Sequence, residues 1–271
     1  VYGADSDLDP DCQASRLLPR YSGTLLNGSD PLEINLVVMD PLNGEVLALE
    51  GQSSSAGSVN VDAKRNPGSL ITPFIYLNQF TQGFEPASLV WDVPLEGQEL
   101  SAEELHPGCE GECNFQGPVN IRTALVNDYL APASRLWKTQ GSARVEDTLT
   151  LFGFSLEGER CQDCPVFSTI PKLGLIDIAQ GYGVFVNQGF LRGRTVDKIG
   201  LDMRPAAVLE IRDPSGWVVN PVEDLTEKKV ISEQLAFLVN HALSDQTVRL
   251  DGDIYQIGRT TSVKSGFIPE G

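Results

Sequence analysis

Two short segments of the chain carry residues that could do nucleophilic chemistry. Ser69 follows Asn66-Pro67-Gly68 and begins the segment Leu70–Phe80, whose apolar residues have helical spacing. The N–H groups at the start of a helix favour a developing oxyanion, which suits a nucleophilic serine. Serine is also a common N-cap, so capping alone would explain this position as well. The second segment, Lys264-Ser265-Gly266, ends a strand that the pattern predicts over Ile254–Val263.

Histidine catalysis has little support in this sequence. The two histidines are His106, beside Pro107 in a loop, and His241, late in an amphipathic helix. We expect each of them to be a solvated or helix-end side chain. A Ser-His-Asp triad needs a histidine held between the serine and the carboxylate, so this chemistry is set aside.

The five cysteines are Cys12 and two close pairs, Cys109 with Cys113 and Cys161 with Cys164. Four thiolates at such spacings can hold a tetrahedral zinc ion. In an exported protein the same residues would form disulfides, either between the two loops or within each pair. Free thiols are the third alternative. The sequence leaves these possibilities open, and in each of them the pairs are structural.

The charge and composition exclude several functions. The chain of 271 residues has 37 acidic and 20 basic side chains, a formal net charge of -17 and 41% hydrophobic residues. A core can therefore be buried, but no basic cluster is present to bind a nucleic-acid backbone. The apolar runs fall far short of the ~20 residues that cross a bilayer. Because the chain begins at Val1 without a leader pattern, we expect membrane contact only through a segment outside it.

The order of secondary-structure signals predicts an α+β fold. Residues 1–32 are polar and without periodicity, so we interpret them as a linker before a domain over residues 33–271. A hairpin over Glu33–Leu49 turns at Asn43-Gly44, a pair that tolerates positive φ. We expect one sheet to contain this hairpin and the Ile254–Val263 strand, with the helix after Ser69 packed against it. The other predicted elements are helices Ile121–Tyr129, Arg144–Leu151, Leu173–Val186 and Ile231–Leu243, and strands Ala206–Arg212 and Trp217–Val219.

In order and spacing, these segments resemble the transpeptidase domain of penicillin-binding proteins, particularly the bifunctional class A type. The resemblance implies the penicillin-binding-protein/serine β-lactamase-like transpeptidase fold, an antiparallel sheet with a helical half. The family's last strands and helix, which should follow the third motif, are expected to be lacking. The matching stretches are the hairpin Val37–Ala48, the nucleophile turn Arg65–Phe74, the second-motif region Gly117–Ala133, the helix Leu173–Gly189 and the third-motif strand Ile257–Gly266.

The catalytic motifs that the resemblance assigns are altered in this chain. In the family, the Ser of S-x-x-K attacks an acyl carbon and the Lys one helical turn later takes its proton. Ser69 occupies the nucleophile position, but Thr72 stands in place of the Lys, and a neutral hydroxyl cannot act as a general base. The S-x-N motif reads Asp128-Tyr129-Leu130, which loses the hydroxyl and the amide. Only the third motif persists, as Lys264-Ser265-Gly266.

With these changes, the resemblance implies a degenerate domain of the bacterial cell envelope. We expect an extracytoplasmic pseudoenzyme that needs no cofactor and has a binding or structural role in peptidoglycan or cell-surface architecture. Its expected partners are a peptidoglycan peptide or an envelope protein, and not nucleic acid. The alternative is an active acyl-serine D,D-transpeptidase with Ser69 as nucleophile and Asp128 or Lys264 as the base. A surface protein that reuses the fold for structure alone is a third interpretation.

Asp128 and Lys264 are expected to face each other. In the family the hydroxyl of the second motif lies beside the Lys of the third, so Asp128 places a negative charge where a neutral group stood. We predict an ion pair that joins the helical half to the sheet and closes the cleft. The alternative is that both side chains point to solvent and do not meet.

Overall fold

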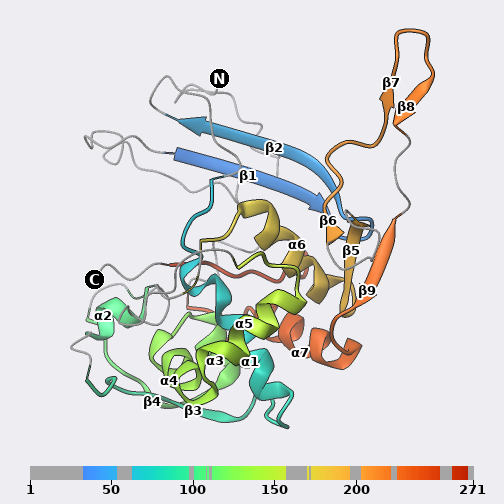
Figure 1. The fold of residues 1–271 in the computed structure, drawn as a ribbon. Helices are drawn as coiled ribbons and strands as arrows, with labels where there is room; N and C mark the ends of the chain where they lie inside the picture. Colours follow the sequence, from blue (N-terminus) through green and yellow to red (C-terminus); the bar gives the residue numbers. More distant parts are fainter. Residues whose placement is uncertain are drawn as a thin grey trace.

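Small antiparallel sheets surround a helical half in the computed structural model of the chain (Figure 1). The structure describes residues 33–53, 63–97, 101–107, 109, 112–156, 170, 172–195, 203–220, 225–250 and 258–267. Within these ranges no helix combines the length and the apolar character needed to cross a membrane. The linker over residues 1–32 lies outside the described residues, so its boundary stays a prediction.

The N-terminal hairpin consists of β1 (Glu33–Asp40) and β2 (Glu45–Ser53), in agreement with the sequence. Gly44 closes its turn at a φ of 69°, a left-handed conformation that glycine adopts without strain. A Cβ added to Gly44 would lie 2.7 Å from the carbonyl oxygen of Arg192. The turn therefore packs directly on the backbone of β5 (Phe190–Thr195), and only glycine allows that approach.

Helix α6 (Leu175–Val186) lies between the hairpin and the helical half (Figure 1). Just after this helix, the amide of Asn187 donates a hydrogen bond to the carbonyl of Pro41. The Arg192 guanidinium donates to the carbonyl of Leu42 at 2.8 Å, so the hairpin turn is held at two points. The strands β6 (Met203–Arg204) and β9 (Thr226–Lys229) flank β5, while β7 (Ile211–Arg212) and β8 (Val218–Asn220) form a hairpin that projects from the body.

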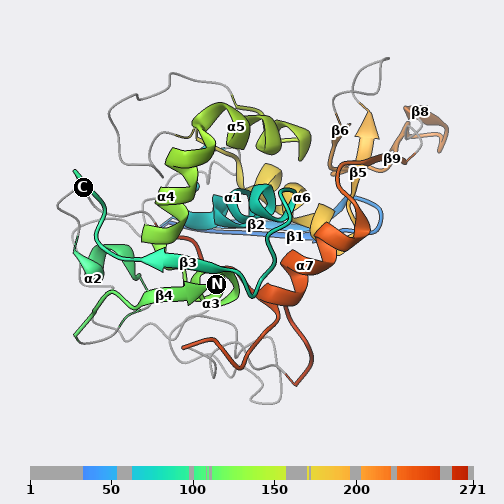
Figure 2. The same ribbon diagram turned by 90° about the horizontal axis from the view of Figure 1, so that it is seen from below.

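Helix α1 (Thr72–Phe80) is the centre of the helical half, and all of its residues are buried. Phe74 contacts four aromatic rings at centroid distances of 4.9 to 5.7 Å, three of them edge-on, the favoured geometry for aromatic pairs. Those rings belong to Phe152, Phe154, Tyr182 and Phe185. The other elements of this part of the fold are η3 (Gly68–Ile71), β3 (Leu89–Asp92), α2 (Ala102–Leu105), β4 (Gly117–Asn120), α3 (Ile121–Val126), α4 (Leu130–Gln140), α5 (Ser142–Leu151) and α7 (Glu233–Leu243) (Figure 2).

The α+β class is confirmed, but the described strands are divided among four small antiparallel sheets. The predicted Ile254–Val263 strand is wrong for residues 258–263, which form no strand, whereas 254–257 lie outside the described residues. A strand needs a neighbouring strand to accept its backbone hydrogen bonds. Here the N–H of Val263 donates instead to the carbonyl of Leu243, at the end of α7, at 3.2 Å. The prediction of a sheet shared with the β1–β2 hairpin is therefore wrong for the described part.

Two glycines with nearly the same φ allow the cost of a left-handed backbone to be distinguished from the cost of steric crowding. Gly189 has a φ of 91°, and an added Cβ would lie 2.2 Å from the carbonyl oxygen of Ile231. Gly216 has a φ of 90° with nothing within 4 Å. We predict that Gly216→Ala lowers the free energy of unfolding by about 1–2 kcal/mol, the cost of a left-handed backbone alone. Gly189→Ala should lower it by distinctly more, because the backbone must also move. Urea denaturation measures both losses, and equal losses would contradict the prediction.

Candidate active site

Ser69 lies in the 3₁₀ turn η3, immediately before α1, and is fully buried at 0% exposure. Gly68 makes the turn with a φ of 52°, and its N–H donates to the Asn66 side chain at 2.9 Å. The residue in the N-cap position of this turn is Pro67, and Ser69 makes no capping bond. Instead, its hydroxyl donates to the carboxylate of Asp128. Capping therefore does not explain this serine.

Asp128 lies in the connection between α3 and α4 with a φ of 56°, so the helix expected over Ile121–Tyr129 ends early, at Val126. One carboxylate oxygen accepts the Ser69 hydroxyl, and the other accepts the Lys264 ammonium at 2.7 Å. Both side chains are buried, with 3% exposure for Lys264 and 5% for Asp128. The predicted ion pair between Asp128 and Lys264 is confirmed.

Burial controls the titration of this cluster. It raises the pKa of the Asp128 carboxyl, although Lys264 and the Ser69 hydroxyl act in the opposite direction. Burial likewise lowers the pKa of Lys264, against the opposing effect of Asp128. Two phenols nearby, Tyr76 and Tyr182, have raised pKa values because they are buried and close to the Asp128 charge. Each group is thus shifted toward its neutral form by loss of hydration.

The segment that contains Lys264-Ser265-Gly266 closes over the serine. The N–H of Phe267 donates to the Ser69 hydroxyl oxygen at 2.8 Å, and the N–H of Ser69 donates to the carbonyl of Phe267 at 2.8 Å. A Cβ on Gly266 would lie 2.3 Å from the Leu70 side chain, so the two segments touch. An oxyanion needs N–H donors aimed at an open position. These two N–H groups already have partners within the protein.

Thr72 and Leu130, the other altered positions, do not extend this cluster. The Thr72 hydroxyl donates to the carbonyl of Ser69 at 2.9 Å and is buried, so it holds the turn of η3 and supplies no base. Leu130 is fully buried in the hydrophobic core at the start of α4. The structure thus brings together Ser69, Asp128 and Lys264 with the backbone around Gly266, and we call this arrangement the polar lock.

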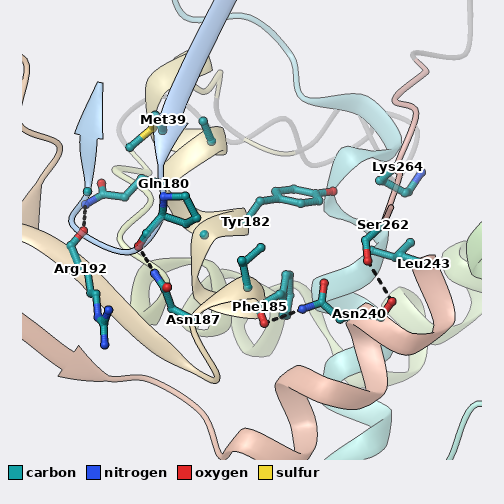
Figure 3. A pocket seen from close by; sticks show the side chains of 15 residues that line it. Met39, Gln180, Tyr182, Phe185, Asn187, Arg192, Asn240, Leu243, Ser262 and Lys264 are labelled. Carbon is teal, nitrogen blue, oxygen red and sulfur yellow. Dashed lines mark hydrogen bonds between the residues drawn. The ribbon is translucent and has the colours of Figure 1, made fainter. Parts of the chain in front are cut away.

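A cavity of about 280 Å³ lies beside the polar lock (Figure 3). The hairpin turn, α6, α7 and the segment of Lys264 line it, mainly with apolar surface. Tyr182 points across it, and its hydroxyl donates to the carbonyl of Leu70 at 2.5 Å. Lys264 reaches the cavity, but Ser69 is not among its lining residues. A molecule in this cavity would meet the lysine and not the serine.

His106 lies at a helix end, as the C-cap of α2, but it is not solvated. His106 is buried, and its Nε2 lies 3.0 Å from Oδ1 of the fully buried Asp92. Its ring also lies 4.3 Å from the Tyr129 ring, between centroids. Asp92 lies on the inward-facing side of β3. A buried histidine requires a polar partner, and Asp92 supplies it for His106. His241 agrees with expectation, since it is exposed in the last turn of α7.

Cys109 and Cys113 form a disulfide, which is the local pairing among the alternatives. This bond leaves neither sulfur as a thiolate, so a zinc site made of Cys109, Cys113, Cys161 and Cys164 is incompatible with it. Cys12, Cys161 and Cys164 lie outside the described residues. The described residues contain no other group of three or more side chains able to hold a metal ion.

Comparison with known proteins identifies relatives by sequence and by fold. No family model matches the chain. Penicillin-binding protein 1A of Vibrio cholerae is 26% identical over 236 residues, which cover 76% of this chain and 27% of that protein. Penicillin-binding protein 1A of Pseudomonas aeruginosa is 29% identical over 158 residues, 57% of this chain and 19% of that protein. The chain thus spans less than a third of the length of these relatives.

Solved structures share the fold. The penicillin-binding protein PonA1 of Mycobacterium tuberculosis superposes with a TM-score of 0.61 at 19% identity, over 86% of this chain and 59% of that chain. Penicillin-binding protein 1A of Haemophilus influenzae gives a TM-score of 0.60 at 22% identity, over 78% of this chain and 34% of that chain. The chain is therefore a homologue of penicillin-binding protein 1A and has the fold of a penicillin-binding-protein transpeptidase domain.

Proposed function

We propose that this chain is a catalytically inactive transpeptidase-like domain of the bacterial cell envelope, with a binding or structural role in peptidoglycan or cell-surface architecture. The observation that carries the proposal is the polar lock, in which the Ser69 hydroxyl is held by Asp128 and by the N–H of Phe267. The sequence relatives are penicillin-binding proteins, which supports an extracytoplasmic location. The Cys109–Cys113 disulfide fits an oxidising compartment.

Three requirements of acyl transfer are unmet around Ser69. An amine base is missing at Thr72, and such a base contributes roughly 10²–10⁴ in rate. The N–H groups of Ser69 and Phe267 bond within the protein and are not free for a tetrahedral intermediate. The serine is also fully buried, so an acyl donor has no path to it without movement of residues 264–267.

The polar lock joins the helical half to the segment of residues 258–267. Lys264 donates to Asp128 and also to the carbonyl of Ser265 at 2.5 Å, so its ammonium is not free to meet a substrate carboxylate. Asp128 would itself repel such a carboxylate. What was a substrate cleft in the family is, in this proposal, a closed contact between two parts of the domain.

One observation favours a second candidate, an active acyl-serine enzyme in which Asp128 is the base. Ser69 donates its hydroxyl proton directly to Asp128, and burial raises the pKa of this carboxyl toward the range of a useful base. This candidate requires residues 264–267 to move away and release the two N–H groups.

Labelling with a fluorescent penicillin separates the two candidates. We predict no covalent adduct on Ser69 by intact-protein mass spectrometry, because the hydroxyl is buried and lacks free oxyanion donors. Thr72→Lys combined with Asp128→Ser restores an amine and frees Ser69, and slow labelling should then appear. Leu130 is left unchanged because it belongs to the core.

The control for this experiment is Ser69→Ala in each background. Circular dichroism shows whether the double variant is folded. Stoichiometric labelling of the unmodified chain that disappears in Ser69→Ala would refute inactivity and support the Asp128-based enzyme.

A double-mutant cycle measures the polar lock as a structural element. We predict that Lys264→Met lowers the free energy of unfolding by about 3–5 kcal/mol, because it leaves the Asp128 charge buried without its partner. Adding Asp128→Leu should recover most of this loss, since a buried ion pair replaced by apolar groups is often neutral. Guanidinium denaturation of the four proteins gives the coupling energy, and a loss below about 1 kcal/mol, typical of exposed pairs, would contradict a buried lock.

The pH dependence of the Lys264→Met variant has a defined sign. Without Lys264, the pKa of Asp128 in the folded state rises further above its ordinary value of 3.8. The folded state then binds a proton more tightly than the unfolded state, so stability is highest at acidic pH and falls as pH rises through the folded-state pKa. The Lys264→Met, Asp128→Leu double variant should lack this decline. Equal pH profiles for the two variants would show that Asp128 is solvated.

A further inference from the structure

A second feature lies outside the polar lock, on the outer side of the helical half. A groove of about 430 Å³ runs between β3, the end of α1 and α4, and shares no lining residue with the polar lock. Figure 2 shows β3 beside α4. Leu89 and Trp91 lie at alternate positions of β3 and face outward, 67% and 62% exposed. Phe84 adds a third exposed apolar side chain. The groove therefore has a wall of exposed apolar side chains.

The charge of this groove is opposite to that of the whole chain. Among the described residues, the charged side chains that line it are Arg135 and Arg144, whereas the chain has a net charge of -17. Arg135 is held in place, since it donates to the carbonyls of Val93 and Pro94. Arg144 is exposed, and among the described residues its guanidinium has no hydrogen-bond or ion-pair partner. Within the described residues, the groove lining thus includes an unpaired cation and an exposed tryptophan.

Two glutamine amides add hydrogen-bonding capacity that the described residues leave unused. The Gln79 side chain is only 6% exposed, lines the groove, and has no hydrogen bond to another described residue. Gln140 donates to the carbonyl of Ile75 at 3.1 Å, but its buried Oε1 has no partner in the described part of the chain. A side-chain amide can donate to and accept from a peptide group. The Gln79 amide lines the groove and is available to a peptide group there, whereas the Gln140 oxygen is enclosed by the protein.

We infer that this groove binds an acidic, extended peptide segment of a partner protein, in which apolar residues alternate with glutamate or aspartate. Apolar side chains would pack on Trp91 and Leu89, while a carboxylate would pair with Arg144. Tryptophan and arginine are the residue types that most often dominate protein-protein binding energy. The described lining residues include two arginines and no acidic group, so the occupant is expected to carry negative charge. The inference does not depend on whether Ser69 reacts.

A peptide array with the full chain tests this inference. The probes are acetylated hexapeptides in which glutamate alternates with each apolar residue type, and lysine twins of the same peptides. We expect the best glutamate peptide to bind at least about tenfold more tightly than its twin, with affinity falling as salt is raised. Trp91→Ala should weaken it at least about tenfold, and Arg144→Glu at least about fivefold.

The matched control is Trp217→Ala, which removes another exposed tryptophan, on the β7–β8 side of the molecule, and should change affinity by less than about twofold. The inference is overturned if no glutamate peptide exceeds its lysine twin, or if Trp91→Ala and Trp217→Ala behave alike. Two further outcomes would replace it. Binding of tetra-N-acetylchitotetraose at Trp91 without peptide binding would indicate a glycan site. Dimers in sedimentation that Trp91→Ala abolishes, again without peptide binding, would indicate a second copy of the chain.

Discussion

The carboxylate of Asp128 is the group on which the arrangement of this domain depends. It is buried where three segments distant in sequence meet: the turn of η3, the α3–α4 connection and residues 258–267. A carboxylate is tolerated inside a protein only when hydrogen bonds and an opposite charge replace its hydration. Ser69 satisfies one oxygen and Lys264 the other. Because each partner comes from a different segment, satisfying this one group fixes all three segments relative to one another.

The same residue types can serve catalysis or structure, and the difference lies in which polar groups stay unbonded before a substrate arrives. Catalysis depends on interactions that become stronger in the transition state than in the ground state. Around Ser69 the hydroxyl, its own N–H, the N–H of Phe267 and the Lys264 ammonium are all bonded within the protein. A reaction would have to break these bonds first, so their strength would add to the barrier. This internal bonding supports the proposed structural role over the alternative of an active enzyme.

Much of the fold was predictable from local sequence signals. Features that depend on a segment distant in the sequence were not. The hairpin Glu33–Leu49 has a turn sequence that specifies it, and it forms as expected. Helix α4 was not predicted, because Pro132 suggests a break although proline is accepted in a first helical turn. The strand expected up to Val263 does not form in the described part, since an extended sequence pattern does not show which strand would pair with it. In the site, the Asp128–Lys264 pair was predictable from the two motifs that face each other across the family's cleft. The closure by Phe267 was not, because backbone atoms of any residue type can make it.

In the proposed function the groups of the polar lock bond one another, so a partner would be recognised by surface side chains. The net charge of the chain then affects which partners can approach. A chain with a net charge of -17 repels acidic partners at a distance. Its overall electrostatic field therefore does not promote non-specific binding of such partners. Salt screening limits this repulsion to about 8 Å at physiological ionic strength. Within the groove between β3 and α4, the charged lining residues that an acidic segment would meet are Arg135 and Arg144. An acidic segment is then held only if it also fits the apolar wall formed by Leu89 and Trp91. In the proposed complex, the net negative charge of the chain and the local attraction within the groove would together make the contact selective rather than merely strong.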